Sequence, residues 1–377
     1  MKRGLLLSWI CIICLTGCAS FDNFNNYNKV NIFENADEND RIYANFISRS
    51  HDNMRGNLAL YKSKLLYSEL EGTKEIFYIL DFQTNSVYEA GTIENFALRG
   101  RSLALAKDVL YFYVTVYDDQ SLVNVLYAYD FVTNELYQVS QNDYAKKVIP
   151  LISFDNKLYA LQGNQVHETY DSFLEILDEA GNPTRITVKQ NDVGVSKEKN
   201  IEHRIIYVDS DEKNILALEG VKSEEGNRYY YTKYTSDYKC IYACEISSIF
   251  EESTITEQIG LFYAFGDYFM ITDFSGASIL CRCSEGEVEI LLCESDLEYV
   301  VNQCRNREFE YFYVRRTNDI YRLNLHTGLL ERQEYRLENE KSVIRSILAY
   351  KDTLLIEKIT NGEDDIQEIL YLLPLKI

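Results

Sequence analysis

The stretch from Tyr127 to Tyr137, Tyr-Ala-Tyr-Asp-Phe-Val-Thr-Asn-Glu-Leu-Tyr, is the clearest unit of a repeated pattern. Its aromatic and β-branched residues predict two short strands. Asp130 and Asn134 predict a tight turn between them, because Asp and Asn side chains cap nearby backbone groups and tolerate left-handed conformations. A close copy begins at Tyr78 and another at Tyr321. The stretch therefore predicts an antiparallel strand pair that recurs along the chain.

The spacing of the copies defines a longer unit. The turn residue Asp81 lies 49 residues before Asp130. Degraded copies of the pattern occupy residues 176–182, 241–245, 279–286 and 370–374. Each copy follows a short apolar run that predicts a preceding strand, and these runs are 64–67, 109–112, 157–160, 228–231, 267–270, 311–314 and 353–356.

A period of about 40 to 50 residues with several strands per unit is typical of a β-propeller. We therefore predict an all-β chain that forms a β-propeller with seven blades of four antiparallel strands, with six or eight blades as the alternatives. A pair of β-sandwiches would not explain the regular period. Residues 41–47 alternate like a strand and are predicted to pair beside the C-terminal strand near Tyr371. Such pairing closes the ring and removes two exposed sheet edges.

The N-terminus predicts export. Lys2 and Arg3 precede an apolar run that is too short to span a membrane as a permanent helix. The run ends in Leu15-Thr16-Gly17-Cys18, which resembles the lipobox of bacterial lipoproteins. The resemblance implies lipidation of the Cys18 sulfur and cleavage before it, with an ordinary signal peptide or a short membrane anchor as alternatives.

The domain organisation follows from this leader. Residues 1–17 are predicted to be a lipoprotein signal peptide, 18–40 the lipidated Cys18 with a polar, flexible tether, and 41–377 the propeller. The predicted location is the cell membrane or the outer membrane, lipid-anchored on the extracytoplasmic side. Two polar stretches, 189–200 and 219–227, exceed the repeat length and are predicted to be loops on one rim.

Composition excludes several function classes. The net charge of −21 repels phosphate backbones, so no nucleic-acid partner is expected. The single Trp, Trp9, lies in the leader, so the chain lacks the motifs of the tryptophan-aspartate repeat and quinoprotein propellers. The 31 tyrosines suit blade strands with a wet rim, and alternatively a surface on which sugars or peptides stack.

Six cysteines beyond Cys18 lie in the second half of the chain: Cys240, Cys244, Cys281, Cys283, Cys293 and Cys304. Packed thiols, disulfides and a metal site are the three interpretations. Cys281 and Cys283 would face the same side of one strand, about 6.6 Å apart, which is awkward for a bond between them. Residues 209–214 begin like a calcium loop but lack its later ligands, so a polar turn is expected.

No nucleophile elbow, zinc-protease helix, phosphate loop or dinucleotide fingerprint occurs, and no catalytic, metal or cofactor residue is nominated. The expected function is that of a binding or scaffold module for a protein or glycan partner. In architecture alone the chain resembles the lipid-anchored propellers of envelope assembly machinery and of anaerobic Gram-positive bacteria. The alternatives are a metal-centred propeller hydrolase or lactonase, and a sensor that passes ligand occupancy to a membrane partner.

Overall fold

The computed structural model describes residues 28–29, 42–48, 56–118, 121–140, 151–166, 169–177, 183–186, 202–211, 213–223, 226–253, 255–294, 302–305, 309–314, 319–333, 342–351, 353–361 and 366–374. These residues form β-strands and one short helix, α2 (Ile249–Glu252). No helix among them is long and apolar enough to cross a membrane. The predicted all-β class is confirmed.

The described strands pair into seven sheets, each antiparallel within its four successive strands. The first sheet holds β3 (Gly56–Tyr61), β4 (Lys64–Glu71), β5 (Lys74–Asp81) and β6 (Ser86–Ile93). The second holds β7 (Phe96–Ala106), β8 (Val109–Asp118), β9 (Ser121–Asp130) and β10 (Glu135–Ser140). The third holds β11 (Leu151–Phe154), β12 (Lys157–Val166), β13 (Thr169–Leu177) and β14 (Pro183–Ile186).

The remaining sheets continue in chain order. The fourth holds β15 (Glu202–Ser210), β16 (Ile215–Ser223), β17 (Gly226–Tyr234) and β18 (Cys240–Glu245). The fifth holds β19 (Ile259–Phe265), β20 (Tyr268–Asp273), β21 (Ser278–Ser284) and β22 (Glu287–Glu294). The sixth holds β23 (Asn302–Arg305), β24 (Phe309–Val314), β25 (Asp319–Asn324) and β26 (Leu330–Gln333). The seventh holds β27 (Ser342–Tyr350), β28 (Thr353–Asn361), β29 (Ile366–Pro374) and β2 (Ile42–Ser48).

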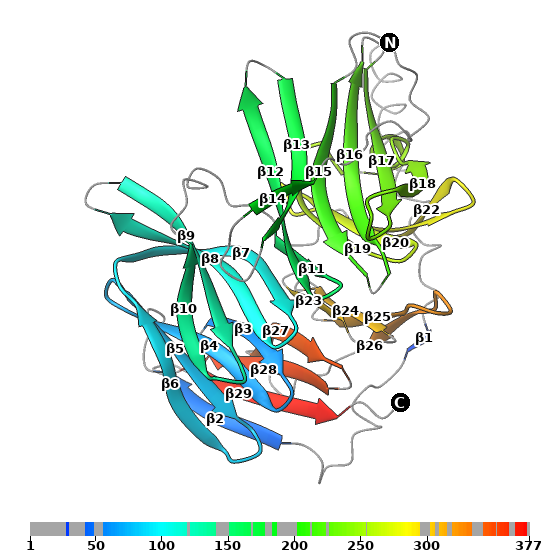
Figure 1. The fold of residues 1–377 in the computed structure, drawn as a ribbon. Coiled ribbons are helices and arrows are strands. Elements are labelled where there is room, and N and C mark those ends of the chain that lie inside the picture. The colour runs from blue at the N-terminus through cyan, green and yellow to red at the C-terminus, as the bar shows by residue number, and fades with distance from the viewer. Residues whose placement is uncertain are drawn as a thin grey trace, which may run out of the picture.

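The last sheet joins the two ends of the chain. Strand β2 pairs antiparallel with β29, and Tyr43 lies opposite Tyr371. Figure 1 shows the blue first strands and the red last strands side by side. The predicted closure near Tyr371 is therefore confirmed. Within the predicted tether, β1 (Asn28–Lys29) adds a parallel strand to β26 at the outer edge of the sixth sheet, and the other tether residues lie outside the described part of the chain.

The core is divided among the junctions between sheets. Each apolar cluster found among the described residues joins two consecutive sheets, and one joins the seventh sheet to the first through Leu65, Leu355 and Leu370. The first strands of neighbouring sheets, such as β7 and β11 or β15 and β19, lie against each other. The sheets thus have a propeller arrangement in which the first strands lie innermost. The predicted number of seven blades remains a prediction.

The repeated turn has the expected chemistry. The Asp130 carboxylate accepts hydrogen bonds from the amides of Val132 and Thr133 at 2.7 and 3.1 Å. Asn134 closes that turn with a φ of 58°, in the left-handed region. Asp81 and Asn324 cap the corresponding turns of the first and sixth sheets, accepting hydrogen bonds from the amides of Gln83 and His326.

The fourth sheet departs from the prediction. Residues 228–231 belong to its third strand, β17, and residues 241–245 to its fourth strand, β18. The apolar second strand is β16, which begins at Ile215. Residues 219–227 are also wrong as a loop, because β16 runs to Ser223 and β17 starts at Gly226. The polarity of residues 219–227 was misleading because Glu219 is fully buried. The other predicted loop, 189–200, lies outside the described residues.

Candidate functional site

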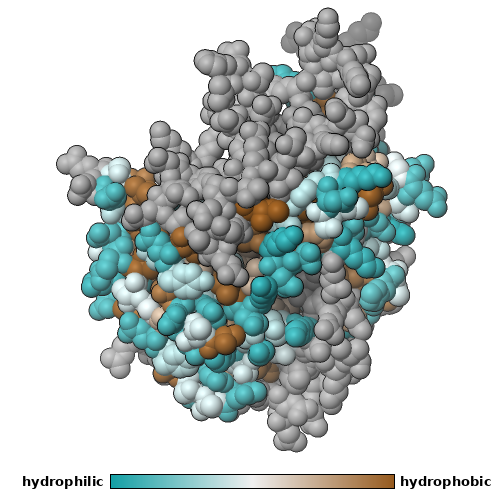
Figure 2. Space-filling view, viewed as in Figure 1, coloured by the Kyte–Doolittle hydropathy of each residue, from teal (hydrophilic) through white to brown (hydrophobic). Residues whose placement is uncertain are grey.

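One end of the ring carries the turns that connect each first strand to its second strand. The described turns are 62–63, 107–108, 155–156, 211 with 213–214, 266–267 and 351. Because the first strands lie innermost, these turns surround the axis, and the turns between third and fourth strands lie further out on the same side. We call this end the turn face. Figure 2 shows that the described surface on the viewed side is largely hydrophilic, with small separate apolar patches.

Three consecutive sheets, the seventh, first and second, present lysines on the turn face. Lys62, Lys107 and Lys351 each occupy the first position of the turn, with φ values of 54°, 56° and 49°. This left-handed conformation favours glycine, and Gly266 fills the same position in the fifth sheet with a φ of 62°. These three exposed side chains, together with the half-buried Lys64 at the start of β4, form what we call the lysine patch.

Aromatic rings bring the three lysine-bearing turns together. The Tyr61 ring lies 5.0 Å from that of Tyr350 and 4.6 Å from that of Phe131, measured between centroids. The Tyr61 hydroxyl donates a 2.5 Å hydrogen bond to Asp108 Oδ1, in the turn that holds Lys107. Burial, followed by this bond, raises the pKa of Tyr61. One buried tyrosine therefore contacts the turns or strands of three sheets.

Two ammonium groups of the patch lie over the rings of this aromatic layer. Lys62 Nζ is 4.7 Å from the Tyr61 ring centroid, and Lys351 Nζ is 5.4 Å from that of Tyr350. A hydrogen bond with the Tyr61 hydroxyl raises the pKa of Lys62. Cation–π contacts of this kind are worth about 0.5–1 kcal/mol at exposed sites. The contacts limit the positions of two of the four ammonium groups.

Lys64 is held by a bridge between the first and second sheets. Its Nζ donates to Asn134 Oδ1 at 3.0 Å, and the Tyr88 hydroxyl donates to the same oxygen at 3.0 Å. Asn134 is the residue that closes the repeated turn of the second sheet, so the motif that forms the fold also positions this lysine.

The opposite part of the turn face is acidic and has a structural role. Asp211 Oδ1 accepts from the amides of Lys213 and Asn214, both at 2.7 Å, and its Oδ2 accepts from the amide of Gly266 at 3.2 Å. Asp209 Oδ2 accepts from the amide of Ala264 at 2.9 Å. These two carboxylates therefore hold the β19–β20 hairpin of the fifth sheet to the fourth sheet, and Asp211 lies in a polar turn between β15 and β16, as expected.

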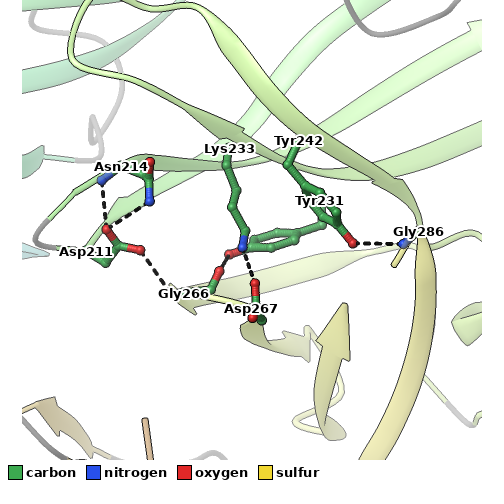
Figure 3. A network of polar contacts seen from close by, with 8 residues as sticks. All are labelled: Asp211, Asn214, Tyr231, Lys233, Tyr242, Gly266, Asp267 and Gly286. Carbon is green, nitrogen blue, oxygen red and sulfur yellow. Dashed lines mark hydrogen bonds and ion pairs between the residues drawn. The ribbon is translucent and has the colours of Figure 1, made fainter. Parts of the chain in front are cut away.

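Lys233 completes this junction (Figure 3). Its Nζ forms an ion pair with Asp267 and lies 4.9 Å from the Tyr242 ring centroid and 5.9 Å from that of Tyr231. The Tyr231 hydroxyl donates to the carbonyl of Gly266 at 2.7 Å. Lys233 is buried, whereas Lys62, Lys107 and Lys351 of the patch are exposed. The fourth and fifth sheets thus use their polar groups to bind each other.

The described cysteines are packed thiols. Cys244, Cys281 and Cys283 are buried in the apolar cluster between the fourth and fifth sheets, and Cys240 is half-buried. All four are free. A hydrogen bond with Cys283 lowers the pKa of Cys244 to about 7, and the same contact, with burial, raises the pKa of Cys283. The side chains of Cys293 and Cys304 lie outside the described part of the structure.

Two further expectations concern the lipobox and a metal site. Cys18 and its lipobox lie outside the described residues. Within the described ranges, no group of three or more His, Cys, Asp or Glu side chains could hold a metal ion. The lysine patch was missed by sequence reasoning, although a signal existed. Lys62, Lys107 and Lys351 each stand two or three residues before the apolar run of a second strand.

Comparisons with known proteins assign no function to this chain. No protein-family model matches this chain, and no curated protein matches it significantly. Among solved structures, one from a structural and mechanistic study of two prolyl endopeptidases matches 84% of this chain and 48% of that chain, at 10% identity and a TM-score of 0.44. This chain thus spans about half the length of that protein. No residue role is transferred from so distant a likeness.

Proposed function

We propose that this protein is a lipoprotein of the cell envelope, anchored by palmitate-type acyl chains on Cys18, whose seven-bladed propeller binds a protein or glycan partner without catalysing a reaction. Residues 1–17 are the signal peptide, 18–40 link the anchor to the ring, and 41–377 form the propeller. The partner is not a nucleic acid, since the chain carries a net charge of −21.

The seven blades of this proposal correspond to the seven described sheets. Two observations support one closed ring: consecutive sheets share each apolar cluster, and the last cluster returns to the first sheet. Pairing of β2 with β29 also covers the edge where the ring would otherwise stay open.

The observation that carries the binding role is the contrast within the turn face. On the fourth and fifth sheets, Asp209, Asp211 and Lys233 are engaged in holding the ring together. On the seventh, first and second sheets, Lys62, Lys107 and Lys351 are exposed, and two of them, Lys62 and Lys351, lie over tyrosine rings. Exposed cations held on a rigid scaffold suit recognition of another molecule.

The anchor is supported by the sequence Leu15-Thr16-Gly17-Cys18 and by the position of β1. Asn28 of β1 is ten residues beyond Cys18, so an extended linker of this length reaches about 35 Å. Pairing of β1 with β26 would therefore hold the outer edge of the sixth sheet near the membrane. Stable anchoring needs two acyl chains or a second signal, which a diacylglyceryl group would satisfy.

Both parts are tested in cells of a bacterial host that expresses the full chain. Wild-type protein should incorporate an alkyne-labelled palmitate and fractionate with membranes, and Cys18→Ala should do neither. Cys14→Ala is the matched control, because it removes a cysteine from the same leader but leaves the lipobox intact. Label on Cys18→Ala at the wild-type level would disprove the anchor.

The binding role is tested by crosslinking in the native membrane followed by mass spectrometry. A single partner enriched with the wild-type chain and lost with Cys18→Ala supports a surface receptor or scaffold. No enriched partner in the native membrane would count against the proposal. Metal content and ligand-dependent thermal shifts of the purified chain would then test the hydrolase and sensor alternatives.

A further inference from the structure

We infer that the lysine patch, Lys62, Lys64, Lys107 and Lys351, is the partner site, and that it binds an acidic peptide segment of a protein partner. This inference rests on the proposed binding function and adds the face of the ring and the chemistry of the partner.

The first argument is the free-energy cost of placing a lysine at a left-handed turn position. An L-residue in the left-handed region costs about 1–2 kcal/mol, which glycine avoids. The fold accepts glycine at this point, because Gly266 fills it in the fifth sheet. Lys62, Lys107 and Lys351 nevertheless fill it in three consecutive sheets, with φ between 49° and 56°. Backbone strain that the fold does not require is a pointer to function.

The second argument is that the three lysines converge. Their turns are far apart in the chain but meet at Tyr61, whose ring contacts the tilted ring of Tyr350 and whose hydroxyl donates to Asp108. Lys62 Nζ lies over the Tyr61 ring and Lys351 Nζ over the Tyr350 ring, at 4.7 and 5.4 Å from the ring centroids. The side chains therefore present their charge together, at the mouth of the ring.

The third argument is charge complementarity. The chain as a whole carries a net charge of −21, so a concentration of lysines is a local exception. Asp108 is the carboxylate found in contact with the aromatic layer, and it accepts the Tyr61 hydroxyl. Such a patch attracts carboxylates while the surrounding acidic surface repels other anionic surfaces, which favours a short acidic segment over an extended polyanion.

The test uses the full-length purified chain and a short fluorescein-labelled poly-glutamate peptide, read by fluorescence anisotropy. Binding should weaken as the salt concentration rises. An exposed lysine–carboxylate contact corresponds to about twofold to fivefold in affinity, so the triple variant Lys62→Gly, Lys107→Gly, Lys351→Gly should bind about ten- to a hundredfold more weakly. Because glycine suits the left-handed position, the urea midpoint of the triple variant should stay unchanged or rise.

Two control variants distinguish the effect of removing lysine charge from the effect of relieving a left-handed backbone position. Glu285→Gly relieves a left-handed residue, φ 55°, in a turn of the fifth sheet and should leave peptide binding intact. Lys74→Gln removes a lysine at the opposite end of the first sheet, where it pairs with Glu94 at 2.7 Å, and should also leave binding intact.

The outcomes are distinguishable. Peptide binding that is equal in wild type and triple variant, a sharp fall in the triple variant's urea midpoint, or tighter binding to phosphatidylglycerol vesicles than to the peptide would each overturn the inference. A membrane partner captured equally well by the triple variant would also overturn it while leaving the proposed binding function standing. Failure to capture any partner with either chain would count against the proposed function itself.

Discussion

Gly328 offers a quantitative test of how the fifth and sixth sheets meet. It lies in the β25–β26 turn with a φ of 71°, and a Cβ added there would stand 2.2 Å from the Tyr268 hydroxyl oxygen. Gly328→Ala should therefore incur two costs. The left-handed backbone costs an alanine about 1–2 kcal/mol, and overpacking against β20 adds about 1–3 kcal/mol. Urea unfolding followed by circular dichroism should show a loss of about 2–5 kcal/mol.

The chain provides its own control. Gly266 has nearly the same conformation, φ 62°, but nothing lies within 4 Å of the position its Cβ would take. Gly266→Ala should cost only the backbone term, about 1–2 kcal/mol. In a Tyr268→Phe background the closest atom to the new methyl group would be a ring carbon at 3.3 Å. Gly328→Ala should then cost little more than Gly266→Ala, and equal losses for the two glycines in the wild-type background would refute the contact between the sheets.

Three more perturbations test the junctions, the buried tyrosines and the ring closure. Asp267→Asn removes the partner of buried Lys233 and should cost about 1–2 kcal/mol, whereas Glu94→Gln, at an exposed pair with Lys74, should cost at most about 1 kcal/mol by urea unfolding. Burial raises the pKa values of four tyrosines, so their stabilising effect is complete below about pH 10 and is lost as the pH rises through the higher folded-state values. These are Tyr129, Tyr231, Tyr234 and Tyr238. Tyrosinate absorbance should therefore lag in the folded protein, and normal titration without unfolding would contradict their burial. A chain that begins after β2 should aggregate on purification, whereas one that begins at residue 41 should remain monodisperse by gel filtration, because β2 covers the edge of β29.

The sequence predicted what depends on local chemistry. Asp81 and Asp130 cap turns through amides two or three residues away, so the same short motif reports the same structure wherever it occurs. The closing strand was also predictable, because its alternation and the repeat count both required a partner for β29. The turn can be predicted within one unit of the repeat, whereas the closing strand required the count of units along the chain.

Prediction failed where a polar residue is satisfied by the fold. Glu219 made residues 219–227 look like a surface loop. The carboxylate is buried in β16, where it accepts hydrogen bonds from the hydroxyls of Thr232 and Tyr234 on the neighbouring strand. These hydrogen bonds offset the cost of burying the carboxylate, but they can be recognised only once the pairing of the strands is known.

The lysine patch was hidden for a different reason. Lys62 and Lys351 are 289 residues apart in the chain, and each is an ordinary turn lysine when read alone. Ring closure brings their turns together through Tyr61 and Tyr350, so their proximity is a property of topology and not of any local motif. The residue types at the first turn position also differ around the ring: Lys in the first, second and seventh sheets, Asp155 in the third and Gly266 in the fifth. A repeat that keeps its strands but varies one strained position preserves the scaffold while changing what the scaffold presents. The variation at this position, more than the repeated turn chemistry beside it, is therefore the basis for the binding site inferred above.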